Sequence, residues 1–395
     1  MQVKREDKKL NRQSQKNGCR FAAQCGGCDL QGVRYKEQLR KKQNYIENLL
    51  KEFGQVLPII AMENPQHYRN KVHHAFTRDR SGNIISGPYE NGTHWIIDID
   101  RCMIEDEKAQ DVIESVKGLC RKYHVPIYNE KTGAGLLRRV LVRCGRASSE
   151  IMVVLVTGRG KFPGKKEFAG ELVKLHPKIK TIILNLNDKR TSMILGDKEE
   201  ILYGPGYIKD VLGGLSFRIS SKSFYQVNPV QTEKLYGCAI EFAGLTGREN
   251  VIDAYCGIGT IGLTASKAAG SVTGVELNPD AVKDARINAA ENGIENARFF
   301  QGDAGEFMKK MAAEGKTADV VFMDPPRSGS SVSFMKAAVK IKPERIIYIS
   351  CGPESLARNL RFFKEHGYCC DKIQPVDMFP YTRHVETVVL LSKVN

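Results

Sequence analysis

A cysteine and a glutamate near the end of the chain have the types and positions expected of a nucleophile and a base. Cys351 follows the apolar run Arg345–Ser350 and precedes a Gly-Pro turn. In an open α/β sheet the catalytic edge lies at the carboxyl ends of the strands, so this turn would present the sulfur to a crevice. We therefore interpret Cys351 as a nucleophile and not as a core thiol. Glu386 begins a final apolar run and is a candidate general base. For three other cysteines we expect buried, inert thiols: Cys256, Cys369 and Cys370.

A second group of cysteines predicts a metal centre. Cys19, Cys25 and Cys28 stand close together, and two glycines between the last two let the backbone fold back so that all three thiols can face one point. The best candidate for a fourth ligand is Cys102, at the end of an expected strand. Four cysteines suit either Zn²⁺ or an iron–sulfur cluster. The spacing is not that of a zinc ribbon, and we favour a structural [4Fe–4S] cluster. A redox Cys-x-x-Cys is less well supported, because no βαβ pattern surrounds it.

A nucleotide-binding unit is predicted between residues 250 and 278. An apolar strand leads into a turn with Gly257 and Gly259, a helical stretch follows, and a second strand ends at Glu276. A carboxylate about 20 residues past a glycine turn is placed to hold ribose hydroxyls. The three-glycine dinucleotide fingerprint is incomplete here, and Asp253 offers an acceptor for an ammonium group. These features suit S-adenosylmethionine better than a pyrophosphate, with a ligand-free βαβ turn as the alternative.

Other polar residues are expected at the same sheet edge. Gln226 and Asn228 precede a helix, where side-chain amides can cap it or reach a ligand. Asp303 follows a short strand, where it could meet an adenine amino group. Asp324 ends a buried strand and opens Asp-Pro-Pro-Arg, a rigid turn that can frame a flat base. Arg327 replaces the aromatic residue that amino-group methyltransferases tend to carry after the prolines, which argues against that chemistry.

The composition favours a polyanionic partner. A net charge of +15 and an isoelectric point near 9.2 suit RNA or DNA, although solubility is an alternative reason for the charge. No apolar run reaches the roughly 20 residues of a membrane span, and the first residues lack a signal-peptide core. We therefore expect a cytoplasmic protein with no membrane partner. Eleven unevenly spread cysteines fit metal binding and catalysis better than disulfides.

The elements that must position these residues divide into three segments. Residues 1–18 form a basic arm that could touch phosphates or be a solvated tail. Residues 19–214 are expected to form a mainly β domain for iron–sulfur binding and RNA recognition, with a helical insertion at Glu105–Tyr123. Residues 215–395 are expected to form an α/β domain with a mostly parallel, doubly wound sheet. Basic residues on the middle segment are expected to recognise substrate shape: Arg69, Lys71, Arg138, Arg139 and Arg143. An amphipathic helix at Tyr35–Phe53 is expected to carry a basic face that includes Arg40, Lys41 and Lys42.

Together these motifs resemble the S-adenosylmethionine-dependent RNA (uracil-C5)-methyltransferases, the bacterial 5-methyluridine family. The resemblance runs from Cys19 nearly to the end of the chain. It implies a Rossmann-like class I methyltransferase domain, S-adenosylmethionine and a [4Fe–4S] cluster as cofactors, and an RNA substrate. The chain has 18 residues before the first cysteine, where many members carry a small β-barrel RNA-binding domain. Gly352 also departs from the Asn that relatives often have.

The resemblance also implies a role for each motif residue. It assigns Cys351 as the nucleophile and Glu386 as the general base. For the cofactor it implies Gln226, Tyr255 and Glu276, and it places Asp324 beside both the cofactor and the uracil base. We add Gly257 from the glycine turn and Asp303 from the end of a strand. For the cluster, it implies Cys19, Cys25, Cys28 and Cys102.

The chemistry explains these residue types. Uracil C5 is a weak nucleophile, so addition of a thiolate at C6 generates the enolate that attacks the methyl group, and a base then removes the C5 proton. The uridine must be flipped or single-stranded to enter. We expect methylation of one uridine in RNA, with 23S rRNA as the first candidate and tRNA as an alternative, by a monomeric enzyme. A non-catalytic iron–sulfur RNA-binding protein would keep the cluster cysteines but would not need Cys351 and Glu386 together.

Overall fold

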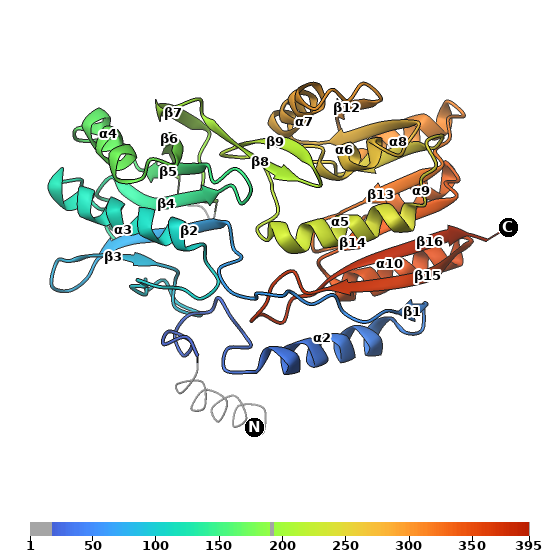
Figure 1. Cartoon of the computed structure of the whole chain (residues 1–395), viewed down its shortest axis with the longest axis horizontal. Coiled ribbons are helices and arrows are strands. Elements are labelled where there is room, and N and C mark those ends of the chain that lie inside the picture. Colours follow the sequence, from blue (N-terminus) through green and yellow to red (C-terminus); the bar gives the residue numbers. More distant parts are fainter. Residues whose placement is uncertain (1–17, 190–192, 395) are drawn as a thin grey trace. The chain divides into compact units, whose positions relative to one another are not determined.

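The computed structural model describes residues 18–189 and 193–394 (Figure 1). The basic arm predicted at residues 1–18 lies outside this part of the chain, apart from Gly18. The chain divides into two compact units. Of the described residues, 18–34, 64–189, 193–210 and 220–222 belong to unit 1, and 35–63, 211–219 and 223–394 belong to unit 2. This division differs from the predicted boundary at residue 214, because residues 35–63 belong to the unit that contains the α/β sheet.

Unit 2 is built on an eight-stranded sheet in the order β1-β15-β16-β14-β13-β10-β11-β12. Neighbouring strands are parallel except that β16 runs antiparallel between β14 and β15. The strands β10, β11 and β13 occur where the sequence predicted apolar runs, and β14 matches its prediction at both ends. The strand bounds are β1 (Gln55–Val56), β10 (Asn250–Ala254), β11 (Ser271–Glu276), β12 (Ala297–Gln301), β13 (Val320–Met323), β14 (Arg345–Ser350), β15 (Tyr368–Val376) and β16 (Glu386–Lys393).

Helices connect and cover these strands, as expected for a doubly wound α/β fold. Four of them, α2, α8, α9 and α10, contribute side chains to one core cluster with the sheet. In Figure 1, α5 lies alongside β14. The bounds are α2 (Tyr35–Leu50), α5 (Pro229–Ala243), α6 (Thr260–Ser266), α7 (Pro279–Glu291), α8 (Ala304–Ala313), α9 (Val332–Lys340) and α10 (Pro353–Glu365). A separate two-stranded sheet pairs β8 (Tyr207–Leu212) with β9 (Leu215–Ser220).

The inner face of α2 corrects one sequence prediction. Gln38, Lys42, Ile46 and Leu50 follow one another at four-residue spacing and are all buried. This spacing places them on one side of an α-helix. Lys42 was expected on the basic, solvent-facing side, but its side chain is only 2% exposed because it pairs with a buried carboxylate of unit 2.

Unit 1 contains a six-stranded sheet in the order β3-β2-β4-β5-β6-β7, antiparallel except for the parallel pair β5–β6. Its bounds are β2 (Lys71–Arg78), β3 (Ile84–Gly87), β4 (Leu137–Cys144), β5 (Ile151–Thr157), β6 (Ile179–Leu186) and β7 (Lys198–Tyr203). The predicted helical insertion is α3 (Glu107–Lys122), and an unpredicted helix α4 (Lys165–Leu175) provides the crossover that a parallel pair requires. The described part of this unit is thus β-rich, with α3 and α4 as its helices.

A second correction concerns the basic residues of this sheet. Arg143, which was expected on the surface, is 4% exposed in β4, and its guanidinium donates a hydrogen bond to the Ser221 carbonyl at 3.4 Å. Burial lowers its pKa to about 10. The other four basic residues of the predicted set are partly buried.

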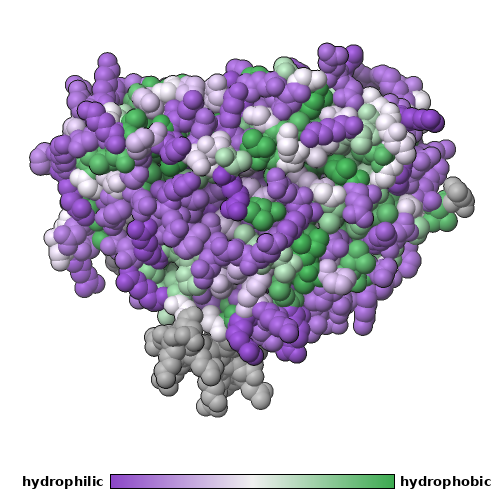
Figure 2. Space-filling model, viewed as in Figure 1, coloured by the Kyte–Doolittle hydropathy of each residue, from purple (hydrophilic) through white to green (hydrophobic). Residues whose placement is uncertain are grey.

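The surface is dominated by hydrophilic side chains on the face shown in Figure 2, where apolar residues form scattered patches. Among the helices of the described residues, none is both long and apolar enough to cross a membrane.

Candidate active site

The predicted nucleophile and base lie beside each other on neighbouring strands of unit 2. Ser350, the last residue of β14, pairs with Thr387 of the antiparallel strand β16. Cys351 directly follows Ser350, and Glu386 directly precedes Thr387. The register therefore places the thiol and the carboxylate next to each other at the carboxyl end of the parallel strands, which is where ligands bind in open α/β sheets.

Both groups are at least partly buried, and burial raises the pKa of each. Glu386 is 4% exposed, and burial, with a smaller contribution from the charge of Asp324, raises its pKa to about 8. The half-buried Cys351 thiol also has a raised pKa, because of burial and then the carboxylates of Glu386 and Asp324. The Arg327 guanidinium opposes both shifts, since a positive charge favours the anionic forms. The four side chains thus form one coupled electrostatic group.

Asp324 enters this group from the end of β13. Desolvation raises the pKa of its carboxyl to about 7. The following turn is tied to the turn after β14, because the Ser355 hydroxyl lies within hydrogen-bonding distance of the carbonyls of both Arg327, at 2.9 Å, and Gly352, at 2.8 Å. A β-carbon at Gly352 would lie 2.5 Å from the Arg327 carbonyl oxygen, so the close approach of the two turns requires glycine in this chain.

The predicted adenosine-binding turn follows β10. Tyr255, Gly257 and Gly259 have positive φ angles of 67°, 55° and 84°. A tyrosine in the left-handed region is uncommon and marks a backbone that its surroundings hold in place. Glu276, at the end of β11, accepts hydrogen bonds from the backbone N–H of Gly257 at 3.1 Å and of Asn278 at 2.8 Å. Its carboxylate therefore organises the glycine turn at the position where ribose hydroxyls were expected.

The remaining predicted polar residues take two kinds of position. Asp253 was expected to receive an ammonium group, but it is 1% exposed and accepts a 2.8 Å hydrogen bond from the Gly262 N–H, so it supports the turn from inside. Asp303 caps α8 by accepting from the Glu306 N–H at 3.0 Å. Asn228 caps α5, and Gln226, two residues earlier, is 8% exposed and does not cap the helix.

One residue of this region was missed from the sequence. Tyr236 on α5 is buried, and its pKa is raised by burial and by the charges of Asp324 and Glu386. A hydrogen bond with the side chain of Gln226 acts in the opposite direction and lowers the pKa of this phenol. The sequence placed Tyr236 on a helix, but only the packing of α5 reveals that it faces the carboxylates.

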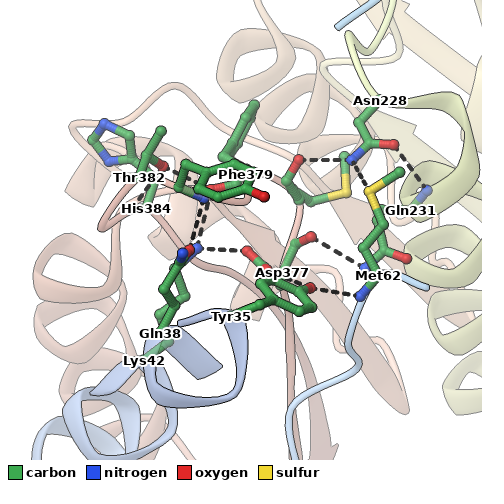
Figure 3. A network of polar contacts seen from close by, with 12 residues as sticks. Tyr35, Gln38, Lys42, Met62, Asn228, Gln231, Asp377, Phe379, Thr382 and His384 are labelled. Atoms are coloured by element: carbon green, nitrogen blue, oxygen red, sulfur yellow. Dashed lines mark hydrogen bonds and ion pairs between the residues drawn. The ribbon is translucent and has the colours of Figure 1, made fainter. Parts of the chain in front are cut away.

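A polar network holds the loop that leads into Glu386 (Figure 3). Asp377, at the start of this loop, is fully buried and pairs with Lys42, while its second oxygen accepts a 2.8 Å hydrogen bond from the Tyr35 hydroxyl. Gln38 accepts a 2.8 Å hydrogen bond from the N–H of Tyr381, whose φ angle of 66° is again positive. Three side chains of α2 thus fix the loop before β16.

The four predicted cluster cysteines lie together in unit 1. Cys19, Cys25, Cys28 and Cys102 line one cavity of about 220 Å³. Gln110 of α3 fixes the backbone at Cys102 by accepting from its N–H at 2.8 Å and donating to its carbonyl at 2.9 Å.

The donor set of this cavity is four thiols, which suits either an iron–sulfur cluster or Zn²⁺. Within the described chain, no group of three or more Cys, His, Asp or Glu side chains is arranged to hold a single metal ion. Burial raises the pKa of Cys28 to about 11 and of Cys102 to about 12, so these thiols are protonated unless cations are bound.

The other cysteines differ in part from their prediction. Cys256 is buried as expected. Cys370 is only partly buried and Cys369 is exposed, because both lie at the start of the antiparallel strand β15, away from the centre of the sheet.

Comparisons with known proteins agree with this fold and identify the family. Residues 34–394 match the model of the tRNA (Uracil-5-)-methyltransferase family. An uncharacterised RNA methyltransferase of Halalkalibacterium halodurans is 45% identical over 382 residues, which cover 95% of this chain and 83% of that protein. One of Clostridium acetobutylicum is 43% identical over 384 residues, with 95% and 83% coverage.

A solved structure shows the same architecture. The tRNA (uracil-54, C5)-methyltransferase of Pyrococcus abyssi, in complex with S-adenosyl-L-homocysteine, superimposes with a TM-score of 0.79 at 29% identity, covering 93% of this chain and 86% of that one. The chain belongs to the RNA uracil-C5 methyltransferase family. It is an S-adenosylmethionine-dependent RNA (uracil-C5)-methyltransferase.

Proposed function

We propose that this enzyme methylates C5 of a specific uridine in 23S rRNA, with Cys351 as the nucleophile and Glu386 as the general base. The observation that carries the assignment of residues is the placement of these two side chains on adjacent strands at the ligand-binding edge of the sheet. The choice of 23S rRNA rests on the resemblance of the sequence motifs. A tRNA uridine is the second candidate, favoured by the family description and by the substrate of the Pyrococcus abyssi relative.

In this mechanism Cys351 acts first. Its thiolate adds to uracil C6, and the electron pair of the C5–C6 bond moves onto the O4 enolate. Arg327 assists by favouring the thiolate over the thiol, because it lowers the pKa that burial raises. C5 of the enolate then attacks the methyl carbon of S-adenosylmethionine, a C–C bond forms, and the methyl–sulfur bond breaks to leave S-adenosylhomocysteine.

Glu386 completes the reaction. Its carboxylate removes the proton from methylated C5, the C5–C6 double bond re-forms, and the thiolate of Cys351 is expelled. A carboxyl whose pKa is raised to about 8 is a stronger base than an exposed glutamate, which suits the removal of a carbon-bound proton. Asp324 lies beside both groups, and we assign it to the uracil ring and the cofactor.

The turn after β10 is the proposed site of S-adenosylmethionine. Glu276 would accept from the ribose hydroxyls with the lone pairs that the two backbone N–H groups leave available. Asp303 would receive the adenine amino group, Gln226 and Tyr255 would flank the cofactor, and Gly257 would allow its close approach.

The cavity in unit 1 is the proposed site of a [4Fe–4S] cluster held by Cys19, Cys25, Cys28 and Cys102. When bound, the cluster supplies cross-links between segments that lie far apart in the sequence. None of these cysteines belongs to unit 2, so we assign them no part in the transfer of the methyl group.

The roles of Cys351 and Glu386 can be separated because their loss blocks different steps. Cys351→Ala should bind RNA and S-adenosylmethionine but transfer no methyl group. In Glu386→Gln, Cys351 should still add to C6 and C5 should still be methylated. The RNA should then stay attached to Cys351, because no base removes the C5 proton. The measurement is denaturing electrophoresis after incubation with methyl-labelled cofactor, which should reveal a labelled protein–RNA adduct only in Glu386→Gln.

A matched control is Cys369→Ala, which removes an exposed cysteine from β15 and should leave turnover unchanged. Normal turnover in Cys351→Ala would overturn the assignment of the nucleophile. Mass mapping of 5-methyluridine in rRNA and tRNA, from cells with and without the gene, distinguishes the two candidate substrates.

A further inference from the structure

An open groove in unit 1 lies apart from the cysteine cavity, and we call it the indole groove. It is lined by the end of β2 and the turn that follows (residues 77–80), by residue 85 of β3, by residues 90 and 94–96, and by the loop at residues 129–131, and its volume is about 570 Å³. The segment that carries Trp95 folds back on itself, because the N–H of Glu90 donates to the Trp95 carbonyl at 2.7 Å and the N–H of Ile97 donates to Pro88 at 3.0 Å. The groove is therefore built on a hydrogen-bonded scaffold.

The central side chain of the groove is an exposed tryptophan. Trp95 is the only tryptophan in the chain and is 60% exposed. Tryptophan is usually buried over most of its area, so a groove that presents it to solvent offers a large flat surface for a stacking partner. The ammonium of Lys131 lies 4.7 Å from the centre of its ring. An aromatic plane with a cation beside it is the arrangement that proteins use for unpaired nucleotides.

The lining of the groove carries three carboxylates and three cations, and each carboxylate accepts a hydrogen bond within the protein. Asp79 accepts from the N–H groups of Ser81 at 2.9 Å and Asn83 at 2.8 Å, Glu90 accepts from the hydroxyl of Thr93 at 3.4 Å, and Glu130 accepts from the hydroxyl of Tyr89. These hydrogen bonds, led by those from Asn83, lower the pKa of Asp79 and hold its charge in the turn. Arg80, by contrast, is exposed and makes no side-chain hydrogen bond or ion pair with any described residue.

We propose that the indole groove binds an unpaired nucleotide of the substrate RNA, with the base stacked on Trp95 and a phosphate between Arg80 and Lys131. The proposal rests on the proposed function for the presence of an RNA substrate, and it adds a contact in unit 1 that is separate from the transfer chemistry in unit 2. A stacked base and a bridging phosphate account for an exposed aromatic side chain and an unengaged arginine in one groove.

The single tryptophan makes the site directly observable. Titration of the full-length protein with a single-stranded RNA 12-mer should quench tryptophan fluorescence in parallel with binding, because Trp95 is the single source of emission when the excitation wavelength is one that tyrosine does not absorb. The same RNA as a duplex should quench less, since its bases are already stacked. Heparin supplies negative charge without bases and should bind with little quenching. Equal quenching by heparin, or saturated RNA binding with unchanged fluorescence, would overturn the proposal.

The affinity of substituted proteins for labelled RNA tests the groove independently of tryptophan fluorescence. Trp95→Ala should weaken binding of the 12-mer about five- to a hundredfold, and Trp95→Phe should retain most of the affinity. Arg80→Gln should lower the slope of log affinity against log salt by about one. The matched controls in unit 1 are Tyr203→Ala, which removes another exposed aromatic residue, and Lys174→Gln, which removes another exposed cation. Trp95→Ala affinity within twofold of the wild type, in a variant with native circular dichroism, would overturn the proposal.

The two hypotheses fail differently. If the groove is wrong but the proposed function is right, Trp95→Ala binds and methylates RNA normally, and Glu386→Gln still forms the labelled adduct. If the proposed function is wrong, no adduct forms, while RNA still quenches Trp95.

Discussion

Cys351 and Glu386 are controlled by the same neighbours. Burial and the charge of Asp324 raise the pKa of both groups, and the Arg327 guanidinium lowers it. The proposed mechanism needs both groups in their anionic forms, and burial makes each anion more reactive but less abundant. Arg327 is therefore placed to set the pH at which the enzyme works. This explains in physical terms why a cation, and not an aromatic residue, follows the two prolines.

The pH dependence of single-turnover methyl transfer should reveal this control. Below about pH 8 both groups are largely protonated, so the rate should increase as pH rises. Arg327→Gln removes the charge that favours both anions, both pKa values rise further, and the profile should move to higher pH by roughly 0.5–1 unit. Its rate should be about three- to tenfold lower at pH 7 and should recover at high pH.

The control for this experiment is Arg361→Gln, because Arg361 is an exposed arginine of α10 that pairs with Glu52. Its profile should match that of the wild type. A defect in Arg327→Gln that is the same at every pH would contradict the electrostatic role and indicate a contact with substrate instead.

The residues whose positions could be predicted from the sequence are those at the ends of strands. Cys351, Glu276 and Asp324 could be placed at one sheet edge because parallel strands put their carboxyl ends together. The inward position of Asp253 could not be predicted, since its neighbour Gly262 comes from the following helix and both become buried only when α6 packs on the sheet. Tyr236 was missed for the same reason.

At the scale of elements, α2 is joined to the loop before β16 by a buried ion pair. Lys42 is 2% exposed and Asp377 is fully buried, and the Lys42 ammonium also donates to the Phe379 carbonyl at 3.0 Å. Such a pair contributes little net stability when complete, but the removal of one partner leaves a buried charge uncompensated. The ion pair fixes one arrangement of the loop that leads into Glu386.

Lys42→Met should therefore destabilise unit 2 by about 3–5 kcal/mol, because the carboxylate of Asp377 loses its counter-ion. Denaturant unfolding measures this change. The neighbouring Lys41→Met is the matched control: Lys41 is exposed on the same helix, so its substitution should change stability by less than about 0.5 kcal/mol. The double variant Lys42→Met/Asp377→Leu should recover much of the loss, and equal instability of the single and double variants would contradict the ion-pair explanation.

The helices and strands of unit 2 were predictable because their apolar patterns are long and regular. The strand β14 matched at both ends, and α2 matched at its start. The buried position of Lys42 was not predictable, since its partner is 335 residues away in sequence and a lysine on a helix is usually solvated. The helix α4 was missed because its pattern lies between two apolar runs that read as strands.

On the scale of the whole molecule, the residues proposed for the cluster and those proposed for the chemistry belong to different units. The four cluster cysteines belong to unit 1, and the strand-end residues proposed for chemistry and cofactor binding belong to unit 2. The sequence analysis also put these two sets of residues in different domains, but it assigned residues 35–63 to the domain of the cysteines, whereas they belong to unit 2. Their assignment depends on the pairing of β1 with β15 and on the contacts of α2, which join the two ends of the chain.

The cysteine cavity provides the last prediction. Anaerobically purified protein should contain about four irons per chain and a brown chromophore that oxygen bleaches. Cys102→Ser should lose this chromophore, because a serine hydroxyl is a much weaker acid than a thiol and so does not supply the anionic sulfur ligand that iron needs.

Calorimetric affinity for S-adenosylmethionine should stay within about twofold in this variant, because the glycine turn and Glu276 belong to unit 2 with their own hydrogen bonds. Cys369→Ser, at an exposed position of β15, should keep both the iron and the affinity. Stoichiometric zinc without iron in the wild type would contradict the cluster, and a large loss of cofactor affinity in Cys102→Ser would contradict the separation of the two sites.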